Sequence, residues 1–263
     1  MNDTSDNAKD DDKYRAPALS KGLDILELLA GEARGKTQVE VAKTLGRTTS
    51  EIFRMLMVLR QRGYVELSDD GDRYALTTKM FEIAHRHPPI RRLTSIAGDE
   101  MQRLADDINQ SVHLGIMHSG KVLVIAQVDC PDNNVTSVRL GAQIPLFDTA
   151  SGRVLTAWME DRLRAQLLDA VDGSAERRKD FIEGIPEVLE KGYCENASLT
   201  IEGVVNISCP IRDFSGKVVA ALTIPFVKRL SGTSIRSVDE SREALLSVCR
   251  SISRQLGASV HVD

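Results

Sequence analysis

Three features that mark particular classes of protein are scarce in this sequence: cysteine, aromatic residues and long hydrophobic runs. The 263 residues include four cysteines, far apart in the chain, and 11 aromatic side chains. The first number argues against a disulfide scaffold or a Cys-x-x-Cys metal site, and the second against a stacking platform for single-stranded nucleic acid. No apolar run reaches the length of about 18 residues that a membrane span needs. Residues 1–15 are acidic, unlike a signal peptide. We therefore expect a cytoplasmic protein without membrane contact, with a disordered acidic tail at 1–15.

An excess of charge of one sign is also lacking over the whole chain, but the distribution is uneven. The 34 basic and 38 acidic residues give a net charge of −4, which argues against a uniformly basic nucleic-acid coat. Residues 16–92 nevertheless carry 13 basic and 10 acidic side chains, whereas residues 93–263 carry 18 and 23. Within residues 43–62, five basic side chains accompany one acid, Glu51. Such a cluster fits a phosphate-binding surface, although a solvated helix face is the commoner source of a charge run.

Hydrophobic periodicity predicts three short helices before residue 63. The first begins near Leu19 and ends at Gly31. Two capping boxes, Thr37 with Glu40 and Thr48 with Glu51, predict where the second and third helices begin.

The third predicted helix has a buried stripe and a polar face. Ile52, Leu56 and Leu59 recur at helical spacing and form the stripe. Phe53 and Met57 lie beside the polar face of this helix. At 100° per residue, the face opposite the stripe consists of Ser50, Arg54, Met57 and Gln61.

Two β-type runs on either side of Asp70-Gly71 follow the third helix and predict a hairpin. Three helices and a hairpin are typical of a winged helix-turn-helix, whose third helix enters the major groove of DNA. In that geometry Arg54 reaches guanine edges, Ser50 reaches a phosphate or base, and Arg73 on the wing reaches a phosphate. Phe53 and Met57 either touch thymine methyl groups or pack on the wing. The alternative is a winged helix used only for protein contacts. The predicted DNA-contacting residues are Arg47, Thr48, Thr49, Ser50, Arg54 and Arg73.

The length of the chain suggests about two domains, and prolines mark the boundary. His87-Pro88-Pro89 breaks a helix that begins near Thr78, because proline removes a backbone donor and restricts the preceding residue. A connector helix follows over 93–109. The predicted domains are a DNA-binding domain at 16–86, a linker with the connector helix at 87–109, and a second domain at 110–263.

The pattern after residue 110 predicts an α+β domain. Two β-type runs meet at Ser119-Gly120, and a last helix is striped by apolar residues from Leu245 to Leu256. Between them the sequence predicts a strand at 134–141, helices at 149–159, 161–171 and 176–191, and strands at 204–213 and 217–227.

This second domain shows no catalytic or metal-binding motif in its sequence. An HExxH motif, a nucleophile elbow and glycine motifs for phosphate or dinucleotides are all missing. His113 and His118 lie near a strand and its turn, where histidine is more often a satisfied or exposed residue than a ligand. Cys209 fits a small buried hydrophobe. We therefore expect no enzyme activity, no metal and no cofactor.

The sequence resembles the IclR-type (isocitrate lyase regulator) family of transcriptional regulators. The resemblance spans about residues 17–256 and is carried by APALSKGLDILELLA, GRTTSEIFRMLMVLRQRGYV, DRYALTTKMFEIA and three C-terminal segments. It implies a winged helix-turn-helix followed by a GAF-like α/β effector-binding domain, and dimers that often pair into tetramers. Ser50 and Arg54 match the family's recognition segment, whereas Thr48, Thr49 and Glu51 differ, so the family's preference for a DNA sequence does not transfer.

The three C-terminal segments combine small polar residues with apolar walls, as small-molecule pockets do. They are LFDTASG at 146–152, CENASL at 194–199, and the strand pair VVNIS and ALTIP. The resemblance implies that the first is a helix N-terminus that closes the cavity, where free amides favour an anion. It also implies polar contacts in the second and third segments, although Pro225 replaces one family hydroxyl. The predicted effector-binding residues are Leu146, Phe147, Ala150, Ser151, Asn196, Asn206 and Thr223.

Two of these predictions have simpler alternatives. Leu146 and Phe147 fit core packing as well as pocket lining. A buried Asn196 or Asn206 is satisfied either by a ligand or by neighbouring backbone. For Asp148 we expect an N-cap of the following helix rather than a ligand contact.

The sequence as a whole predicts an effector-responsive regulator that binds double-stranded operator DNA. We expect a repressor of a catabolic operon that is released by a small carboxylate, hydroxy acid, lactone or semialdehyde. Two alternatives are a GAF-like enzyme with a DNA-binding appendage, and a regulator whose empty sensor serves only for oligomerisation.

Overall fold

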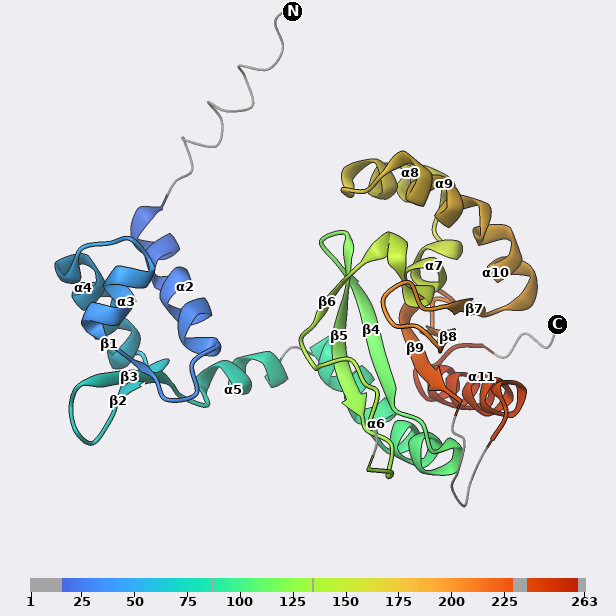
Figure 1. Cartoon of the computed structure of the whole chain (residues 1–263), viewed down its shortest axis with the longest axis horizontal. Coiled ribbons are helices and arrows are strands. Elements are labelled where there is room, and N and C mark those ends of the chain that lie inside the picture. The colour runs from blue at the N-terminus through green and yellow to red at the C-terminus, as the bar shows by residue number, and fades with distance from the viewer. Residues whose placement is uncertain (1–15, 87, 134, 229–235, 260–263) are drawn as a thin grey trace, which may run out of the picture. The chain divides into compact units, whose positions relative to one another are not determined.

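A computed structural model describes residues 16–86, 88–133, 135–228 and 236–259. The chain divides into two compact units, residues 1–88 and 89–263, which are described separately below (Figure 1). The acidic tail predicted to be disordered and the linker residue His87 lie outside the described residues.

The first unit is a winged helix-turn-helix, as predicted. Each of the three expected helices is present, and both capping boxes form with the expected partners. The predicted hairpin is present and gains a short third strand, β1, so that the sheet order is β1-β3-β2. The elements are α2 (Pro17–Ala30), β1 (Lys36–Thr37), α3 (Gln38–Thr44), α4 (Thr49–Gln61), β2 (Val65–Leu67), β3 (Arg73–Leu76) and α5 (Lys79–Arg86).

The core of this unit joins the helices to the wing. Ile25 of α2, Val41 of α3, and Ile52 and Leu56 of α4 are fully buried. Val65 of β2 belongs to the same cluster. Each buried aliphatic side chain stabilises the fold by about 1.5–3 kcal/mol, so this core fixes which face of α4 points outward.

The second unit is built on a six-stranded sheet of order β6-β5-β4-β9-β8-β7, in which every neighbouring pair is antiparallel. This is the predicted α+β class. The elements are α6 (Pro88–Ile108), β4 (Val112–His118), β5 (Lys121–Val128), β6 (Gln143–Pro145), the 3₁₀ helix η1 (Leu146–Asp148), α7 (Ala150–Ala157), α8 (Asp161–Ala170), α9 (Ala175–Glu183), α10 (Ile185–Lys191), β7 (Cys194–Ala197), β8 (Val204–Arg212), β9 (Val218–Val227) and α11 (Val238–Gln255).

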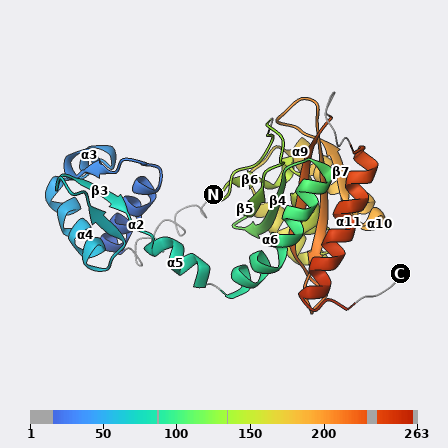
Figure 2. The same ribbon diagram turned by 90° about the horizontal axis from the view of Figure 1, so that it is seen from below.

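Helices cover both faces of this sheet. On one face α6 and α11 lie side by side (Figure 2) and bury residues such as Met101, Leu222 and Leu245. Helices α7 to α10 cover the opposite face, where Phe181 and Val154 are fully buried. Because strand side chains alternate between faces, every second residue of β4, β8 and β9 points toward α7.

The structure corrects two predicted elements of the second unit. The predicted strand at 134–141 is wrong over residues 135–141, which form no strand. Gly141 turns the chain with a φ of 79°, and the backbone hydrogen bonds to β5 begin only there. The single helix predicted at 176–191 is instead two helices, because Gly184 ends α9 and α10 then begins with Pro186 in its first turn.

Two further differences concern a strand and a helix start. Strand β7, within the segment predicted only as a pocket wall, pairs with β8 along its length. Helix α6 begins at Pro88, earlier than the predicted connector helix, because proline is tolerated in a first turn where its missing N–H would have no partner. None of the helices in the described ranges has the length and apolar content that crossing a membrane requires.

Candidate DNA-binding face and effector cavity

Helix α4 has one buried face and one open face, as predicted. Ile52 and Leu56 are fully buried, while Ser50, Arg54 and Gln61 are exposed. Phe53 and Met57 are 45% and 40% exposed, so packing on the wing does not bury them. The open face therefore offers a hydroxyl, a guanidinium and an amide together with accessible apolar groups.

Contacts at its first turn hold α4 in place. The Thr48 hydroxyl accepts a hydrogen bond from the Glu51 amide, and the Glu51 carboxylate accepts from the Thr48 amide. Lys21 of α2 donates to the same carboxylate at 2.5 Å. The hydrogen bond from Lys21, and then those from Thr48, lower the pKa of Glu51 to about 2. The start of α4 is thus tied both to its own cap and to α2.

The remaining predicted residues at the start of α4 differ in their contacts. Arg47 is exposed and lies 3.8 Å from the Asp24 carboxylate. Thr49 is exposed, and its carbonyl accepts a hydrogen bond from Gln38 of α3 at 3.0 Å. The Thr48 hydroxyl serves as the cap. Arg47 and Thr49 therefore keep accessible side chains, whereas the hydroxyl of Thr48 has an internal role.

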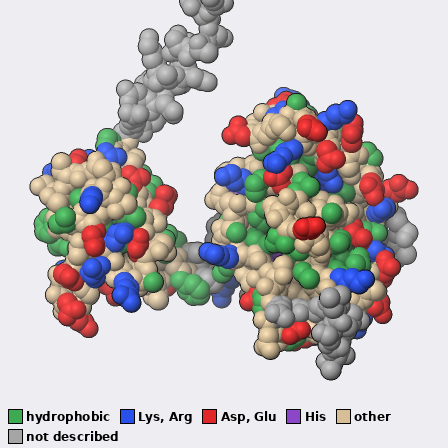
Figure 3. All heavy atoms as spheres, viewed as in Figure 1, with side chains coloured by type: hydrophobic (Ala, Val, Ile, Leu, Met, Phe, Trp, Pro, Cys, Tyr) green, Lys and Arg blue, Asp and Glu red, His purple; other side chains and the backbone are tan. Residues whose placement is uncertain are grey.

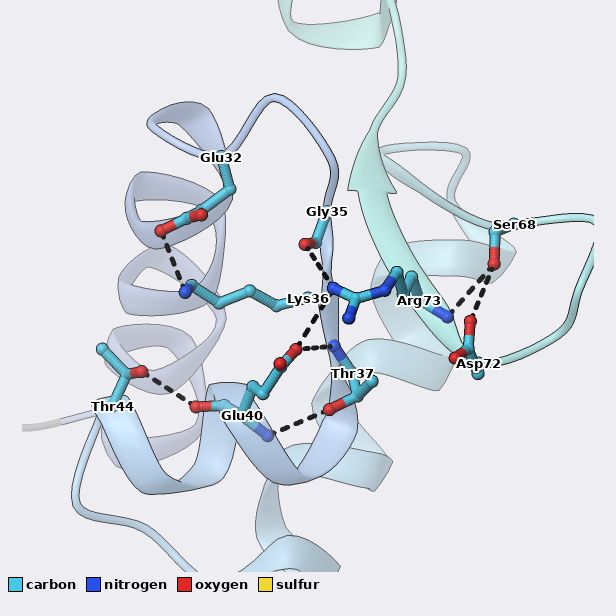
Figure 4. Close-up of polar contacts among 9 residues, drawn as sticks. All are labelled: Glu32, Gly35, Lys36, Thr37, Glu40, Thr44, Ser68, Asp72 and Arg73. Atoms are coloured by element: carbon cyan, nitrogen blue, oxygen red, sulfur yellow. Dashed lines mark hydrogen bonds and ion pairs between the residues drawn. The ribbon is translucent and has the colours of Figure 1, made fainter.

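The structure gives Arg73 other partners than the predicted phosphate. Its Nη1 donates to the Gly35 carbonyl at 3.2 Å and lies 3.4 Å from the Glu40 carboxylate, so the side chain ties β3 to the start of α3 (Figure 4). The tip of the wing is acidic, with Asp69, Asp70 and Asp72 exposed, and acidic side chains gather at the end of the β2–β3 hairpin in Figure 3. Like charges repel, so this tip does not suit a DNA phosphate.

A cavity of about 130 Å³ lies in the second unit between the sheet and the start of α7. It receives side chains from β4, β6, η1, α7, β8 and β9 and from the chain before β6 and after β7. Its lining consists of His113, Thr136, Ser137, Val138, Ile144, Pro145, Asp148, Thr149, Ala150, Ser151, Ser198, Thr200, Ile201, Val204, Asn206, Thr223 and Pro225.

Four of the seven predicted effector-binding residues line this cavity. They are Ala150, Ser151, Asn206 and Thr223. The Thr223 hydroxyl shares a buried hydrogen bond of 2.8 Å with Ser208, on the neighbouring strand.

The other three predicted residues lie outside the lining. Leu146 and Phe147 are core residues, and the Phe147 ring packs edge-on against Phe181 with 5.3 Å between centroids. Asn196 pairs directly with Asn206 across β7 and β8. Its Oδ1 is buried without a hydrogen-bond partner among the described residues.

His113 also lines the cavity, although the sequence analysis expected a satisfied or exposed histidine at this position. It is 4% exposed, and burial lowers the pKa of its imidazole to about 4, so the ring is neutral at pH 7. Within the described part of the chain its Nδ1 has no hydrogen-bond partner. In the sequence, the signal for a cavity residue is a polar side chain within an otherwise apolar strand. In the structure, His113 lies opposite Thr223 on the neighbouring strand.

Asp148 also lines the cavity, but it is not the predicted N-cap. That role belongs to Thr149, whose hydroxyl accepts a hydrogen bond from the Gly152 amide at 3.0 Å. One Asp148 oxygen accepts from Arg177 at 3.0 Å, while the other is buried without a partner in the described ranges. The prediction failed because the 3₁₀ helix η1 shifts the start of α7 by one residue.

The cavity combines apolar walls with hydroxyl, amide, imidazole and carboxylate groups, which is the composition of a small-molecule site. Among the described residues, no group of three or more histidine, cysteine, aspartate or glutamate side chains is arranged to hold a metal ion.

Two models of known families match this chain, one in each of its two units. The model described as "Bacterial transcriptional regulator IclR C-terminal" matches residues 90–254, and the IclR helix-turn-helix model matches residues 18–69. The chain belongs to the IclR family. A member of this family is a transcriptional regulator, which sets aside the alternative of an enzyme with a DNA-binding appendage.

IclR-family relatives match nearly the whole chain. The HTH-type transcriptional regulator KdgR of Escherichia coli is 28% identical, over 92% of each chain. The glycerol operon regulatory protein of Streptomyces coelicolor is 29% identical, over 92% of this chain and 96% of its own. An IclR homologue from Microbacterium hydrocarbonoxydans, solved as a complex with 4-hydroxybenzoate, superposes with a TM-score of 0.78 at 20% identity, over 92% of this chain and 100% of that one. This last similarity shows a shared fold.

Proposed function

We propose that this IclR-family regulator is a repressor of a catabolic operon, released from its operator by a small organic effector bound in the cavity. The observation that carries the proposal is the pairing of an open, polar α4 face in one unit with a polar cavity in the other. Relatives whose names refer to an operon or a repressor, such as the glycerol operon regulatory protein and AllR, support this direction.

On the DNA side, α4 is the reading element. Arg54 is exposed in the first half of the helix, the part that contacts base edges in helix-turn-helix proteins. Its guanidinium suits a bidentate contact with guanine, while Ser50 suits a phosphate or base. Phe53 and Met57 suit thymine methyl groups, the apolar feature of the major groove. The acidic wing tip and the contacts of Arg73 with Gly35 and Glu40 make Arg47 the better placed of the two predicted flanking cations.

The chain acts as a dimer or tetramer in this proposal. A symmetric dimer places two α4 helices in half-sites about 34 Å apart, or a multiple of that distance. An effector that binds one arrangement of the units better than the other shifts the population toward it. Displacing one α4 from its half-site lowers operator affinity, so a modest rearrangement releases the DNA.

The replacement Arg54→Ala tests the assignment of α4. A good bidentate contact with guanine contributes about 1–3 kcal/mol, and a dimer loses two of them, so we expect specific affinity to fall by about 30-fold or more. The operator is first selected from random-sequence DNA by the full-length protein, and fluorescence anisotropy then gives the affinity for operator and for unrelated DNA.

Arg34→Ala provides a matched control, because it removes the same charge from an exposed position on the loop between α2 and β1. We expect this control to weaken the binding of operator DNA and of unrelated DNA slightly and equally. Operator affinity that is unchanged in Arg54→Ala would contradict α4 as the reading helix.

Effector binding in the cavity is tested by thermal unfolding of the full chain with organic acids, lactones, semialdehydes and aromatic acids. A ligand at about 100 times its dissociation constant stabilises the folded state by about 2.7 kcal/mol. A compound that both raises the unfolding temperature and releases the operator identifies the effector class. If no compound has either effect, the alternative of an empty sensor that serves oligomerisation is favoured.

A further inference from the structure

The lining of the cavity also specifies the chemistry of its ligand. We propose that the effector is an uncharged compound with at least two hydroxyl groups, such as a short polyol or a hydroxylated lactone, and not a carboxylate. This inference rests on the proposed function, because it takes the cavity to be the effector site.

The charges around the cavity favour an uncharged ligand. Among the described lining residues none is lysine or arginine, and the single acid is Asp148. Arg177, from α9, already pairs with that acid at 3.0 Å. A ligand carboxylate would therefore lose its hydration without meeting a free cation, and burying an unpaired charge is costly.

The N-terminus of α7 does not compensate for this missing cation. The first amides of a helix attract anions because they lack partners within the helix. Here the Thr149 hydroxyl accepts from the Gly152 amide, which leaves the Ala150 and Ser151 amides, and the Asp148 carboxylate lies at the same end of α7. A ligand carboxylate placed there would meet a second carboxylate, which opposes the attraction of the helix end.

The unpartnered groups of the lining call for a ligand that donates hydrogen bonds. The second oxygen of Asp148 and Nδ1 of His113 are buried, and neither has a partner in the described ranges. Asp148 is a carboxylate paired with Arg177, and a carboxylate only accepts hydrogen bonds. The neutral His113 ring has one donating and one accepting nitrogen, and a ligand hydroxyl group can pair with either.

Other lining groups accept and donate, which hydroxyl groups match best. Ser151 is buried and Asn206 half-buried, and their side chains make no hydrogen bond within the described part of the chain. A hydroxyl group can donate to Asp148 or His113 and accept from Asn206 or Ser151. Keto acids offer only acceptors when ionised, so they would leave the Asp148 oxygen unsatisfied.

The size of the cavity limits the ligand to a few carbons. Its volume of about 130 Å³ is close to that of an engineered protein cavity of about 150 Å³ that binds benzene, a molecule of six carbons. Polyols and lactones of three to five carbons are therefore of about the right size.

The experiment compares three matched sets of probes by thermal unfolding of the full chain and by calorimetry. The uncharged hydroxylated set contains glycerol, erythritol and erythrono-1,4-lactone. The anionic set contains their acid counterparts, glycerate and erythronate, together with pyruvate. γ-Butyrolactone provides the ring without hydroxyl groups. We expect binding within the first set, and none for γ-butyrolactone.

A variant makes the result independent of which probe binds best. For a hydroxylated probe, Asp148→Asn replaces a charged acceptor by a weaker one, and we expect binding about tenfold weaker. For an anionic probe the same change removes a repelling charge, so binding would tighten. Asp169→Asn is the matched control, since Asp169 pairs with Arg178 at 3.0 Å and lies outside the cavity lining.

The outcomes separate this inference from the proposed function. Binding by the anionic set, tightened by Asp148→Asn, would overturn the inference while leaving the cavity as the effector site. Binding that is unchanged in Asp148→Asn would mean that the ligand lies elsewhere, which contradicts both. Failure of the whole hydroxylated set to bind would also overturn the inference.

Discussion

The two candidate binding regions of this protein differ in how their polar side chains are positioned and solvated. On α4 the polar side chains are exposed, and the helix carrying them is fixed by a cap within its own first turn and by a core beneath it. In the cavity the polar side chains are mostly buried or half-buried, with His113, Ser151 and Thr223 the buried ones, and they come from strands and helices far apart in the sequence. The first region is a local construction, and the second depends on the whole sheet.

This difference suits the proposed partners. A DNA duplex is large and charged, so a reading surface must be open and can remain hydrated until contact. A small effector gains most from a site that removes it from water and offers a few fixed hydrogen-bonding groups. A buried site carries the risk of unsatisfied groups when empty, as His113 and Asp148 illustrate.

The largest expected effect on this comparison comes from Phe181→Ala. Phe181 is fully buried on α9, with its ring edge-on to Phe147 in the apolar cluster between the sheet and helices α7 to α10. Removing a buried phenyl ring costs about 3–5 kcal/mol. We expect hydrogen exchange, measured by mass spectrometry on the full chain, to accelerate in peptides of β4, β8 and β9 and to stay unchanged in peptides of α4.

The neighbouring replacement Ile182→Ala is the control, because that side chain is 46% exposed. We expect it to have little effect on exchange anywhere. Equal acceleration in α4 and in the sheet of the Phe181 variant would show that the two units do not unfold independently.

A somewhat smaller effect is expected in the second unit when the pH is lowered. The folded-state pKa of His113 is about 4, below its ordinary value of 6.5. Between these values the unfolded chain binds a proton that the folded chain does not, so the free energy of unfolding falls as pH is lowered from about 6.5 to 4. The loss is on the order of 3 kcal/mol. Above pH 6.5 this contribution is fully present.

Urea unfolding of the full chain and of His113→Gln, across this pH range, isolates the effect. We expect the variant to lose part of the pH slope, while His118→Gln, at an exposed position of the same strand, keeps it. The same slope in the wild-type chain and the His113 variant would mean that other groups cause the acid sensitivity.

The smallest expected effect is on the local construction of α4. Thr48→Ala removes the hydroxyl that accepts from the Glu51 amide, and losing such a cap costs about 1 kcal/mol. We expect faster hydrogen exchange in peptides covering the first turn of α4, with no change in the second unit. Thr48→Ser, which keeps the hydroxyl, should behave as the wild-type chain does; identical exchange in the alanine variant would show that Lys21 and the core alone fix the helix.

Sequence patterns predicted the first unit better than the second for a physical reason. Capping boxes and helical periodicity involve residues three or four positions apart, so Thr48, Glu51, Ile52 and Leu56 can be recognised without knowing the fold. The role of Arg73 escaped prediction, because its partners Gly35 and Glu40 lie 38 and 33 positions away in the sequence.

In the second unit the sequence predicted the α+β class, the main strands and four cavity residues, the last through a family resemblance. It missed the turn at Gly141, because which segment pairs with the edge of β5 depends on the fold. It also missed the break at Gly184, because the helical pattern continues across that residue. It left Phe147 open between the wall of the cavity and the hydrophobic core, because an aromatic side chain next to a polar segment fits either place.

The sequence by itself determined where the helices of the first unit begin, which face of α4 stays open, and that the chain belongs with winged helix-turn-helix regulators. These properties depend on short-range hydrogen bonds and on a repeating hydrophobic pattern. Only the tertiary structure decided that His113 and Thr223 face each other and that Asp148 shares their cavity. Strand register brings together residues more than one hundred positions apart, and no local pattern encodes which of them meet.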